Sequence, residues 1–210
     1  MSSSEVQSDS SRAENDVSVT EVLSLTALPT PKLPSKFKTF YKKSGTPIPI
    51  NPHLTLTRED VKDYVVIIGD VHGCADELEE LISQAPQNST FICVGDLVKK
   101  GPKSRRCVEI VHEKGLTVRG NHEDHLIAAY YRLGKYKALE KVSLNDTINQ
   151  MKGGIDGGHD LMEYLADCPI TISLPFLNVM ICHAGVLPGK EINEQEFKDL
   201  LWIRNHSHFT

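Results

Sequence analysis

Four short segments of the chain combine glycine with aspartate, asparagine or histidine, residue types that bind ligands and move protons. They are Gly69-Asp70-Val71-His72-Gly73, Gly95-Asp96-Leu97-Val98, Gly120-Asn121-His122-Glu123 and Cys182-His183-Ala184-Gly185. One such segment alone usually marks a simple turn. Four in series, each following a predicted strand, are a strong joint signal, because the carboxyl ends of strands in an α/β sheet meet at one crevice.

The polar side chains in these segments are oxygen and imidazole donors, with no thiolate among the candidates. The candidate metal ligands are Asp70, His72, Asp96, Asn121 and His183. Such a set suits Mn, Fe, Zn or Mg rather than a zinc bound by cysteines. A carboxylate such as Asp96 can bridge two cations about 3.5–4 Å apart, which lower the pKa of a shared water towards ~7. The predicted chemistry is attack of the resulting hydroxide on phosphorus.

Short aliphatic runs and amphipathic stretches alternate after Arg58, and these elements must position the four segments. We expect strands at 64–68, 90–94 and 116–118, helices at 75–85, 104–114, 122–133 and 160–165, and a hairpin-like strand pair at 170–174 and 179–182. The continuous β-branched run at 64–68 is typical of a strand buried on both faces. The alternation predicts an α/β fold with a largely parallel sheet.

Composition limits the classes of protein that the chain can belong to. Its 210 residues are 40% hydrophobic and 24% charged, which suits one soluble domain with a tail. The net charge of -5 gives no global attraction to DNA. The aliphatic run at 65–68 is far shorter than the roughly 20 residues that span a bilayer. Five cysteines without a CxxC pair predict reduced thiols and a cytoplasmic location.

The first 57 residues differ from the rest in being rich in serine and proline. We expect 1–57 to be a disordered tail, its later part lying against the domain, and 58–210 to be the folded domain. Within the tail, 32–43 interleaves lysines with aromatic residues. This stretch is either an arm for acidic lipid or RNA or a solvated linker, and composition favours the linker.

Taken together, the four segments resemble those of the calcineurin-like metallophosphoesterase superfamily. Within it they resemble the phosphoprotein-phosphatase clan, and most of all its bacterial-type diadenosine-tetraphosphatase (ApaH-like) branch, over roughly 64–204. The resemblance implies an αβ sandwich of mixed sheets flanked by helices. It also implies two divalent metal ions on the strand-end loops, with Mn favoured.

The resemblance also implies a role for each candidate residue. The Asp and His of the first segment would hold one ion, and Asp96 would bridge both ions. Asn121 and His183 would hold the second ion, and His122 would be the general acid for the leaving group. The family has a further histidine that completes the second site on a later strand. The only later histidines of this chain are His206 and His208, which we interpret as tail residues rather than that ligand. We therefore expect a C-terminally truncated domain.

The second segment separates the branches of the clan. Protein Ser/Thr phosphatases usually carry Asp-Arg where this chain has Lys99 and Lys100. Lys100 can bind phosphate as a point charge, whereas Lys99 cannot orient the imidazolium of His122. That loss is tolerable for the acidic leaving group of a phosphoanhydride and costly for phosphoserine. The predicted substrate is therefore polyanionic: a dinucleoside polyphosphate, a capped RNA 5' end or inorganic polyphosphate.

One further basic residue, Arg119, and one cluster of basic residues have two interpretations each. Arg119 is a candidate for substrate binding or, with more support, for a salt bridge that buttresses the site. Five cations gather after the second segment: Lys99, Lys100, Lys103, Arg105 and Arg106. They attract a polyanion or form a solvated helix N-terminus, where cations oppose the helix dipole.

For the whole chain, the alternative functions are a protein Ser/Thr phosphatase and an inactive truncated phosphate-binding module.

Overall fold

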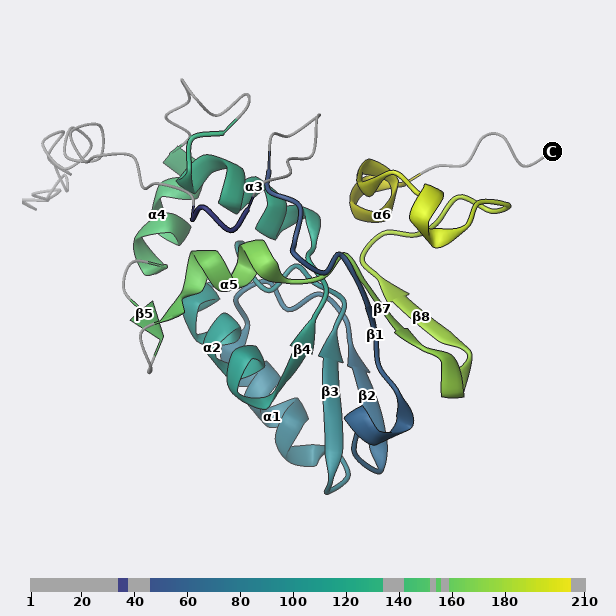
Figure 1. Ribbon diagram of the computed structural model, residues 1–210. Coiled ribbons are helices and arrows are strands. Elements are labelled where there is room, and N and C mark those ends of the chain that lie inside the picture. Colours follow the sequence, from purple (N-terminus) through teal and green to yellow (C-terminus); the bar gives the residue numbers. More distant parts are fainter. Residues whose placement is uncertain (1–33, 38–45, 134–141, 152–153, 156–158, 205–210) are drawn as a thin grey trace, which may run out of the picture. The chain divides into compact units, whose positions relative to one another are not determined.

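The computed structural model describes residues 34–37, 46–133, 142–151, 154–155 and 159–204 (Figure 1). The chain divides into two compact units, Met1–Thr30 and Pro31–Thr210, and the described residues all belong to the second. Among the described residues, no helix has both the length and the apolar character needed to cross a membrane.

Three parallel strands form the first sheet, in the order β2 (Tyr64–Ile68), β3 (Ser89–Cys93) and β4 (Gly115–Thr117). Ile68 is paired with Cys93, and Cys93 with Thr117, so the three strands end at the same level. Side chains that follow the strands therefore emerge at one edge of the sheet. The predicted parallel sheet is confirmed, with strand bounds shifted by one residue at β3 and β4.

Helices α1 (Ala75–Gln84) and α2 (Ser104–Lys114) connect these strands and lie beside the sheet (Figure 1). Leu78 of α1 and Val108 of α2 belong to the same buried cluster as Ile68 of β2. Burial of one apolar stripe on each helix against the sheet supplies most of the stabilisation of such a layer.

The second sheet has the order β1 (His53–Thr55), β7 (Thr171–Leu174) and β8 (Val179–Cys182). β7 and β8 form the expected antiparallel hairpin, and β1 runs parallel to β7. Ile92 and Val118, from the first sheet and the residue after it, share a buried cluster with Ile172 and Ile181 of the second. The apolar faces of the two sheets thus share one core, as in the expected αβ sandwich of mixed sheets flanked by helices.

The remaining elements complete the fold around this sandwich: the helices α3 (Asn121–Tyr130), α4 (Val142–Gln150), α5 (Leu161–Asp167) and α6 (Phe197–Trp202), the short turns η2 (Arg58–Asp60), η4 (Pro175–Leu177) and η5 (Ile192–Glu194), and the two-residue strands β5 (Gly154–Ile155) and β6 (His159–Asp160). Leu126 of α3, Leu144 of α4 and Leu165 of α5 extend the cluster formed by α1 and α2. Leu200 and Leu201 of α6 pack with Ile170 in a smaller one.

The last part of the expected tail forms a strand and lies against the domain, as expected for its proline-rich portion. β1 lies within that stretch, and the carbonyl oxygen of Pro52 accepts hydrogen bonds from the backbone of Ile170 (2.8 Å) and Thr171 (3.1 Å). Proline lacks a donor but keeps its acceptor, so a proline-rich segment can still join the edge of a sheet. The rest of the predicted tail, 1–33 and 38–45, lies outside the described residues.

Residues 34–37 also depart from the solvated linker that composition favoured. Phe37 is buried in the large core cluster, and the Nζ atom of Lys36 lies 2.7 Å from a carboxylate oxygen of Glu163 on α5. These four residues therefore pack against the domain. The remainder of the lysine- and aromatic-rich stretch, and with it the choice between an arm and a linker, lies outside the described residues.

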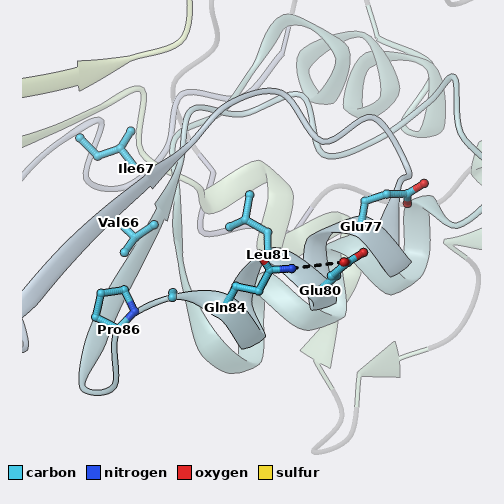
Figure 2. Close-up of a pocket in the computed structure, with 8 residues that line it drawn as sticks. Val66, Ile67, Glu77, Glu80, Leu81, Gln84 and Pro86 are labelled. Carbon is cyan, nitrogen blue, oxygen red and sulfur yellow. Dashed lines mark hydrogen bonds between the residues drawn. The ribbon is translucent and has the colours of Figure 1, made fainter.

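Strand β2 lies at the end of its sheet and borders a groove against α1. The groove has a volume of about 420 Å³, with Val66, Ile67 and Leu81 among its lining residues together with Glu77 and Glu80 (Figure 2). Its apolar side chains are open to solvent, since Ile67 is 47% exposed and Leu81 44%. An exposed apolar strand edge of this kind favours association with another polypeptide.

Candidate metal centre

The four predicted segments converge at the level ends of the strands. Asp70 follows β2 and Asp96 follows β3, while Asn121 and His122 begin α3 just after β4. His183 comes directly after β8 of the second sheet. Asn121 of the third segment and His183 of the fourth, 62 positions apart in the chain, are 3.3 Å apart between amide oxygen and Nε2. The predicted convergence of strand ends is therefore present.

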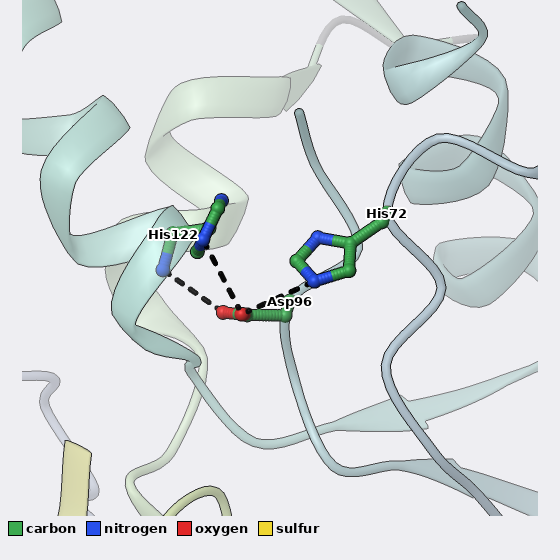
Figure 3. Close-up of side chains that lie close together, drawn as sticks. All are labelled: His72, Asp96 and His122. Atoms are coloured by element: carbon green, nitrogen blue, oxygen red, sulfur yellow. Dashed lines mark hydrogen bonds and ion pairs between the residues drawn. The ribbon is translucent and has the colours of Figure 1, made fainter. Parts of the chain in front are cut away.

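Asp96 lies at the centre of the cluster. Its carboxylate is 4% exposed, and its Oδ2 atom lies 3.7 Å from Nε2 of His72 and 3.8 Å from Nε2 of His122 (Figure 3). On its other side, Oδ1 lies 3.5 Å from Nε2 of His183. Three imidazole nitrogens therefore face one buried carboxylate.

The donor atoms fall into two groups, each compact enough to hold one ion. The first consists of His72, Asp96 and His122, and the second of Asp70, Asp96 and His183, with the donor atoms of each group all within 4.8 Å of one another. Because Asp96 belongs to both groups, it is the residue that can bridge two ions. Asp70 is also 3.6 Å from Nε2 of His72, so it can serve either group.

Backbone carbonyl groups fix the orientation of two of the histidine rings. Nδ1 of His72 lies 3.3 Å from the carbonyl oxygen of Val98, and Nδ1 of His183 lies 2.8 Å from that of Val94. A carbonyl oxygen can only accept, so each Nδ1 is the protonated nitrogen. The Nε2 lone pair of each ring is then directed at the acidic residues, which is the tautomer that binds a metal ion.

Glu123 holds two of the site loops together from within. Its buried carboxylate accepts hydrogen bonds from the backbone amides of Asp96 (2.7 Å), Leu97 (2.8 Å), Val98 (3.1 Å) and Gly120 (2.9 Å). Burial raises the pKa of Glu123 to about 7, with the charge of Asp96 acting in the same direction and the backbone amides opposing it. Glu123 was not among the predicted site residues, although its place after Asn121 and His122 marked it as part of the third segment.

Strained backbone is concentrated around the cluster. Seven non-glycine residues in the described part of the chain have a positive φ, and four of them are His72, Asp96, Lys99 and Lys100. A side chain at Gly73 would meet the carbonyl oxygen of Gly101 at 2.6 Å, so the loop also depends on a close approach that only glycine permits. Strain of this kind persists where the surrounding structure fixes a functional geometry.

His122 is oriented on one side of its ring only. Its Nδ1 atom is buried and has no hydrogen-bond partner in the part of the chain that the structure describes. Burial lowers the pKa of His122 to about 4, and the positive charges of Lys99 and Lys100 act in the same direction against the charge of Asp96. This fits the expectation that Lys99 does not replace an orienting carboxylate.

The five cations after the second segment do not act together. Lys103 is 2.6 Å from Asp76, Arg105 is 2.7 Å from Glu109 and Arg106 is 2.6 Å from Glu79, so three of the five form ion pairs within the domain. The other two lie beside the cluster, and Nζ of Lys100 is 2.5 Å from Nε2 of His72. Attraction of a polyanion by this group therefore depends on Lys99 and Lys100.

Arg119 lies behind the cluster rather than in it. Its guanidinium group is 2% exposed, donates from Nη1 to the carbonyl oxygen of Pro47 at 2.7 Å and from Nη2 to that of Ala166, and lies 3.5 Å from Oδ1 of Asp124. With these partners the guanidinium is held inside the protein. This placement favours the buttressing salt bridge over contact with a substrate.

Comparison with known proteins agrees with this geometry. Residues 64–209 match the calcineurin-like phosphoesterase family. The chain is 34% identical over 134 residues to "Bis(5'-nucleosyl)-tetraphosphatase, symmetrical" of Actinobacillus pleuropneumoniae serotype 5b (strain L20), covering 61% of this chain and 47% of the relative. It is also 34% identical over 128 residues to the protein of the same name from Pectobacterium atrosepticum, covering 58% and 43%.

A solved structure is similar to this chain in three dimensions as well as in sequence. The crystal structure of a protein assigned as a diadenosine tetraphosphatase superposes with a TM-score of 0.54 at 32% identity, covering 69% of this chain and 60% of the other. The chain spans about half the length of the curated relatives it matches. The fold, the four segments and the sequence match lead to one conclusion: the chain belongs to the calcineurin-like phosphoesterase family.

Proposed function

We propose that this protein hydrolyses a phosphoanhydride bond of a dinucleoside polyphosphate with the help of two divalent cations. The observation that carries the proposal is the buried carboxylate of Asp96, which has three imidazole Nε2 atoms at 3.5 to 3.8 Å. The names of the bacterial relatives, symmetrical bis(5'-nucleosyl)-tetraphosphatases, support this class of substrate.

The residues present fit a pair of divalent ions. Asp70 and His72 would hold one, Asn121 and His183 the other, and Asp96 both, so the donors are carboxylate, amide and imidazole groups. The two fixed histidine tautomers present lone pairs rather than protons to the cluster. When bound, such ions, Mn²⁺ in the first place, would supply an activated water for attack on phosphorus and would neutralise phosphate oxygens.

His122 would donate a proton to the leaving oxygen, from the small protonated fraction that a pKa of about 4 leaves at neutral pH. Its ring is held near Asp96, and its Nδ1 lacks a carboxylate partner among the described residues. A weakly oriented imidazole is sufficient for a nucleoside diphosphate, which leaves as a stable anion, and insufficient for a serine alkoxide. The arrangement therefore favours a phosphoanhydride over a phosphoprotein.

Lys100 would bind the phosphate chain of the substrate. Its ammonium group donates to the Nε2 lone pair of His72, which is the lone pair that a metal ion needs. An ion at His72 would therefore displace this ammonium group, which would then be free to bind a substrate phosphate. A lysine makes this contact as a flexible point charge and tolerates phosphates in different positions.

The test is hydrolysis of diadenosine tetraphosphate to two molecules of ADP, measured with and without Mn²⁺. We expect Mn²⁺ to stimulate the reaction and Asp96→Asn to lower kcat/KM by about 100-fold or more. Asp76→Asn is the matched control, because Asp76 is 72% exposed and paired with Lys103. Equal turnover by the wild-type protein and Asp96→Asn would overturn the proposal.

The same assay separates the alternatives. A capped RNA 5' end and inorganic polyphosphate are tested as further anhydrides, and a phosphoserine peptide as an ester. Strong activity on the peptide with none on the anhydrides would assign a protein phosphatase. Binding of one Mn²⁺ or none, without turnover of any substrate, would assign a binding module.

We further propose a reducing compartment such as the cytoplasm. All five cysteines, Cys74, Cys93, Cys107, Cys168 and Cys182, are free thiols. Burial raises the pKa of the thiols of Cys93, Cys107 and Cys168 to about 12, which keeps them protonated and unreactive.

A further inference from the structure

Residues 46–55, here called the N-terminal strap, contact the segment that carries two site residues. Thr46 is fully buried, and its hydroxyl donates to Oδ1 of Asp124 at 2.6 Å. The next residue, Pro47, accepts a hydrogen bond of 2.7 Å from Nη1 of Arg119. The strap precedes residues 64–209, so the family match does not include these contacts.

The two residues that the strap contacts flank Asn121 and His122. Arg119 lies just before Gly120, and Asp124 lies in the first turn of α3, so their ion pair spans the short segment between them. Both side chains are fully or almost fully buried, at 2% and 0% exposure. A buried ion pair keeps its geometry only when further hydrogen bonds satisfy the remaining polar atoms, and the strap supplies two of them.

The strap also reaches the element that carries His183. Its strand β1 pairs in parallel with β7, and β7 pairs with β8, which ends one residue before His183. The backbone of Leu56, just after the strap, adds a hydrogen bond of 2.9 Å to Ser173. One segment of chain is therefore bonded both to the loop of Asn121 and to the hairpin of His183, whose side chains meet at 3.3 Å.

We propose that Thr46 and Pro47 are positioning residues, which hold Asn121 and His122 in place relative to His183 through Arg119 and Asp124. Loss of the Thr46 hydroxyl removes a hydrogen bond that Oδ1 of Asp124 accepts, so the first turn of α3 is held less firmly. Displacement of a ligand by a fraction of an ångström weakens ion binding, because coordination distances are narrow. This inference rests on the part of the proposed function that places divalent ions at the site, and it does not depend on the identity of the substrate.

The test is Mn²⁺ binding to the full chain, measured by titration calorimetry and, as an independent readout, by thermal unfolding with a chelator present. Thr46→Val removes the hydroxyl at nearly constant volume, and we expect about tenfold weaker binding of one Mn²⁺. Thr46→Ser keeps the hydroxyl and should restore binding to within a few-fold. Thr57→Val is the matched control, since Thr57 makes the same kind of bond to Asp60, at 2.8 Å, on the exposed η2 turn.

The outcomes separate this inference from the proposed function. Wild-type affinity in Thr46→Val, with or without a lower unfolding temperature, overturns the positioning role. If Thr46→Val does not fold, Asp124→Asn replaces it, because the amide oxygen can still accept from Thr46 while the ion pair is lost. In that variant too, unchanged Mn²⁺ affinity overturns the inference.

Measurement of the hydrolytic activity distinguishes the positioning role from the proposed function in a second way. A positioning role lowers kcat for diadenosine tetraphosphate in Thr46→Val and leaves KM within a few-fold. A wild-type protein that binds two Mn²⁺ ions but hydrolyses nothing contradicts the proposed function and leaves the binding test of the strap intact. A wild-type protein that binds no Mn²⁺ contradicts both.

Discussion

At the level of single residues, the site depends on the carboxylate of Glu123, which lies outside both groups of candidate metal ligands. Glu123 joins the loop of Asp96 to the loop of Asn121 through backbone amides of both. Each of these amides is part of a tight loop and would otherwise be left unpaired inside the protein. An unpaired buried donor costs about 1–3 kcal/mol, so the loops and the carboxylate stabilise each other.

Glu123→Gln tests this interdependence. The amide keeps the shape of the side chain but turns one acceptor oxygen into a donor that faces backbone N–H groups. We expect the free energy of unfolding to fall by about 1–3 kcal/mol, measured by urea denaturation. Glu77→Gln, on the exposed side of α1, is the control and should change it by less than about 0.5 kcal/mol. Equal stability of the two variants would contradict the role of Glu123.

The candidate ligands could be predicted from the sequence because each stands near a strand end and beside or close to a glycine, as Asp70 and Asp96 do. The hydrogen-bond and ion-pair partners of the buried charges could not be predicted from the sequence. Thr46 meets Asp124 across 78 positions, and a threonine beside prolines carries no local signal for that contact. Lys103 illustrates the same limit, since only the packing of α1 against α2 pairs it with Asp76. The type of a residue predicts whether it can bind a metal ion or move a proton, whereas long-range packing decides which side chain a buried charge contacts.

At the level of elements, β1 shows why a short strand cannot be predicted from hydrophobic periodicity. It has three residues and follows Pro52, so neither alternation nor length identifies it. Its partner β7 pairs His53 with Thr171, far along the chain. The longer elements β2, α1 and α2 were predicted to within one residue, because each has enough residues to show its own period.

The histidine on β1 links this strand to a pH dependence of stability. Burial lowers the pKa of His53 below its usual 6.5, and Nδ1 lies 3.0 Å from the hydroxyl of Thr171. Below pH 6.5 the unfolded chain takes up a proton at His53 that the folded chain resists, so stability is lost as the pH falls from 6.5 through the folded pKa.

We therefore expect His53→Gln to lose less stability than the wild-type protein between pH 7.5 and pH 5.5. The measurement is urea denaturation of both proteins at the two pH values, with a chelator present throughout so that metal binding does not contribute. Equal losses in the two proteins would show that His53 takes up its proton as readily in the folded state as in the unfolded one.

At the level of the whole described domain, both sheets end in strands with exposed apolar side chains. Tyr64 and Ile67 lie on β2 at the edge of the first sheet, and Met180 lies on β8 at the edge of the second, with exposures of 55%, 47% and 39%. Sequence alone predicted that β2 would be buried on both faces, since its residues are uniformly apolar. The reason for the difference is its position at the edge, which depends on the order of strands and not on their composition.

An open apolar edge predicts association of the isolated chain with itself. Within the described residues, the outer edge of β2 pairs with no other strand, and the exposed side chains of Ile67 and Leu81 lie nearby, so a second copy can pair with this edge at high concentration. We expect the weight-average mass in sedimentation to rise with protein concentration, and Ile67→Lys to suppress most of that rise while the circular dichroism spectrum stays unchanged. Ile50→Lys is the matched control, because Ile50 is 63% exposed and lies outside the β2 edge. Equal suppression by both variants would contradict association through the edge of the sheet.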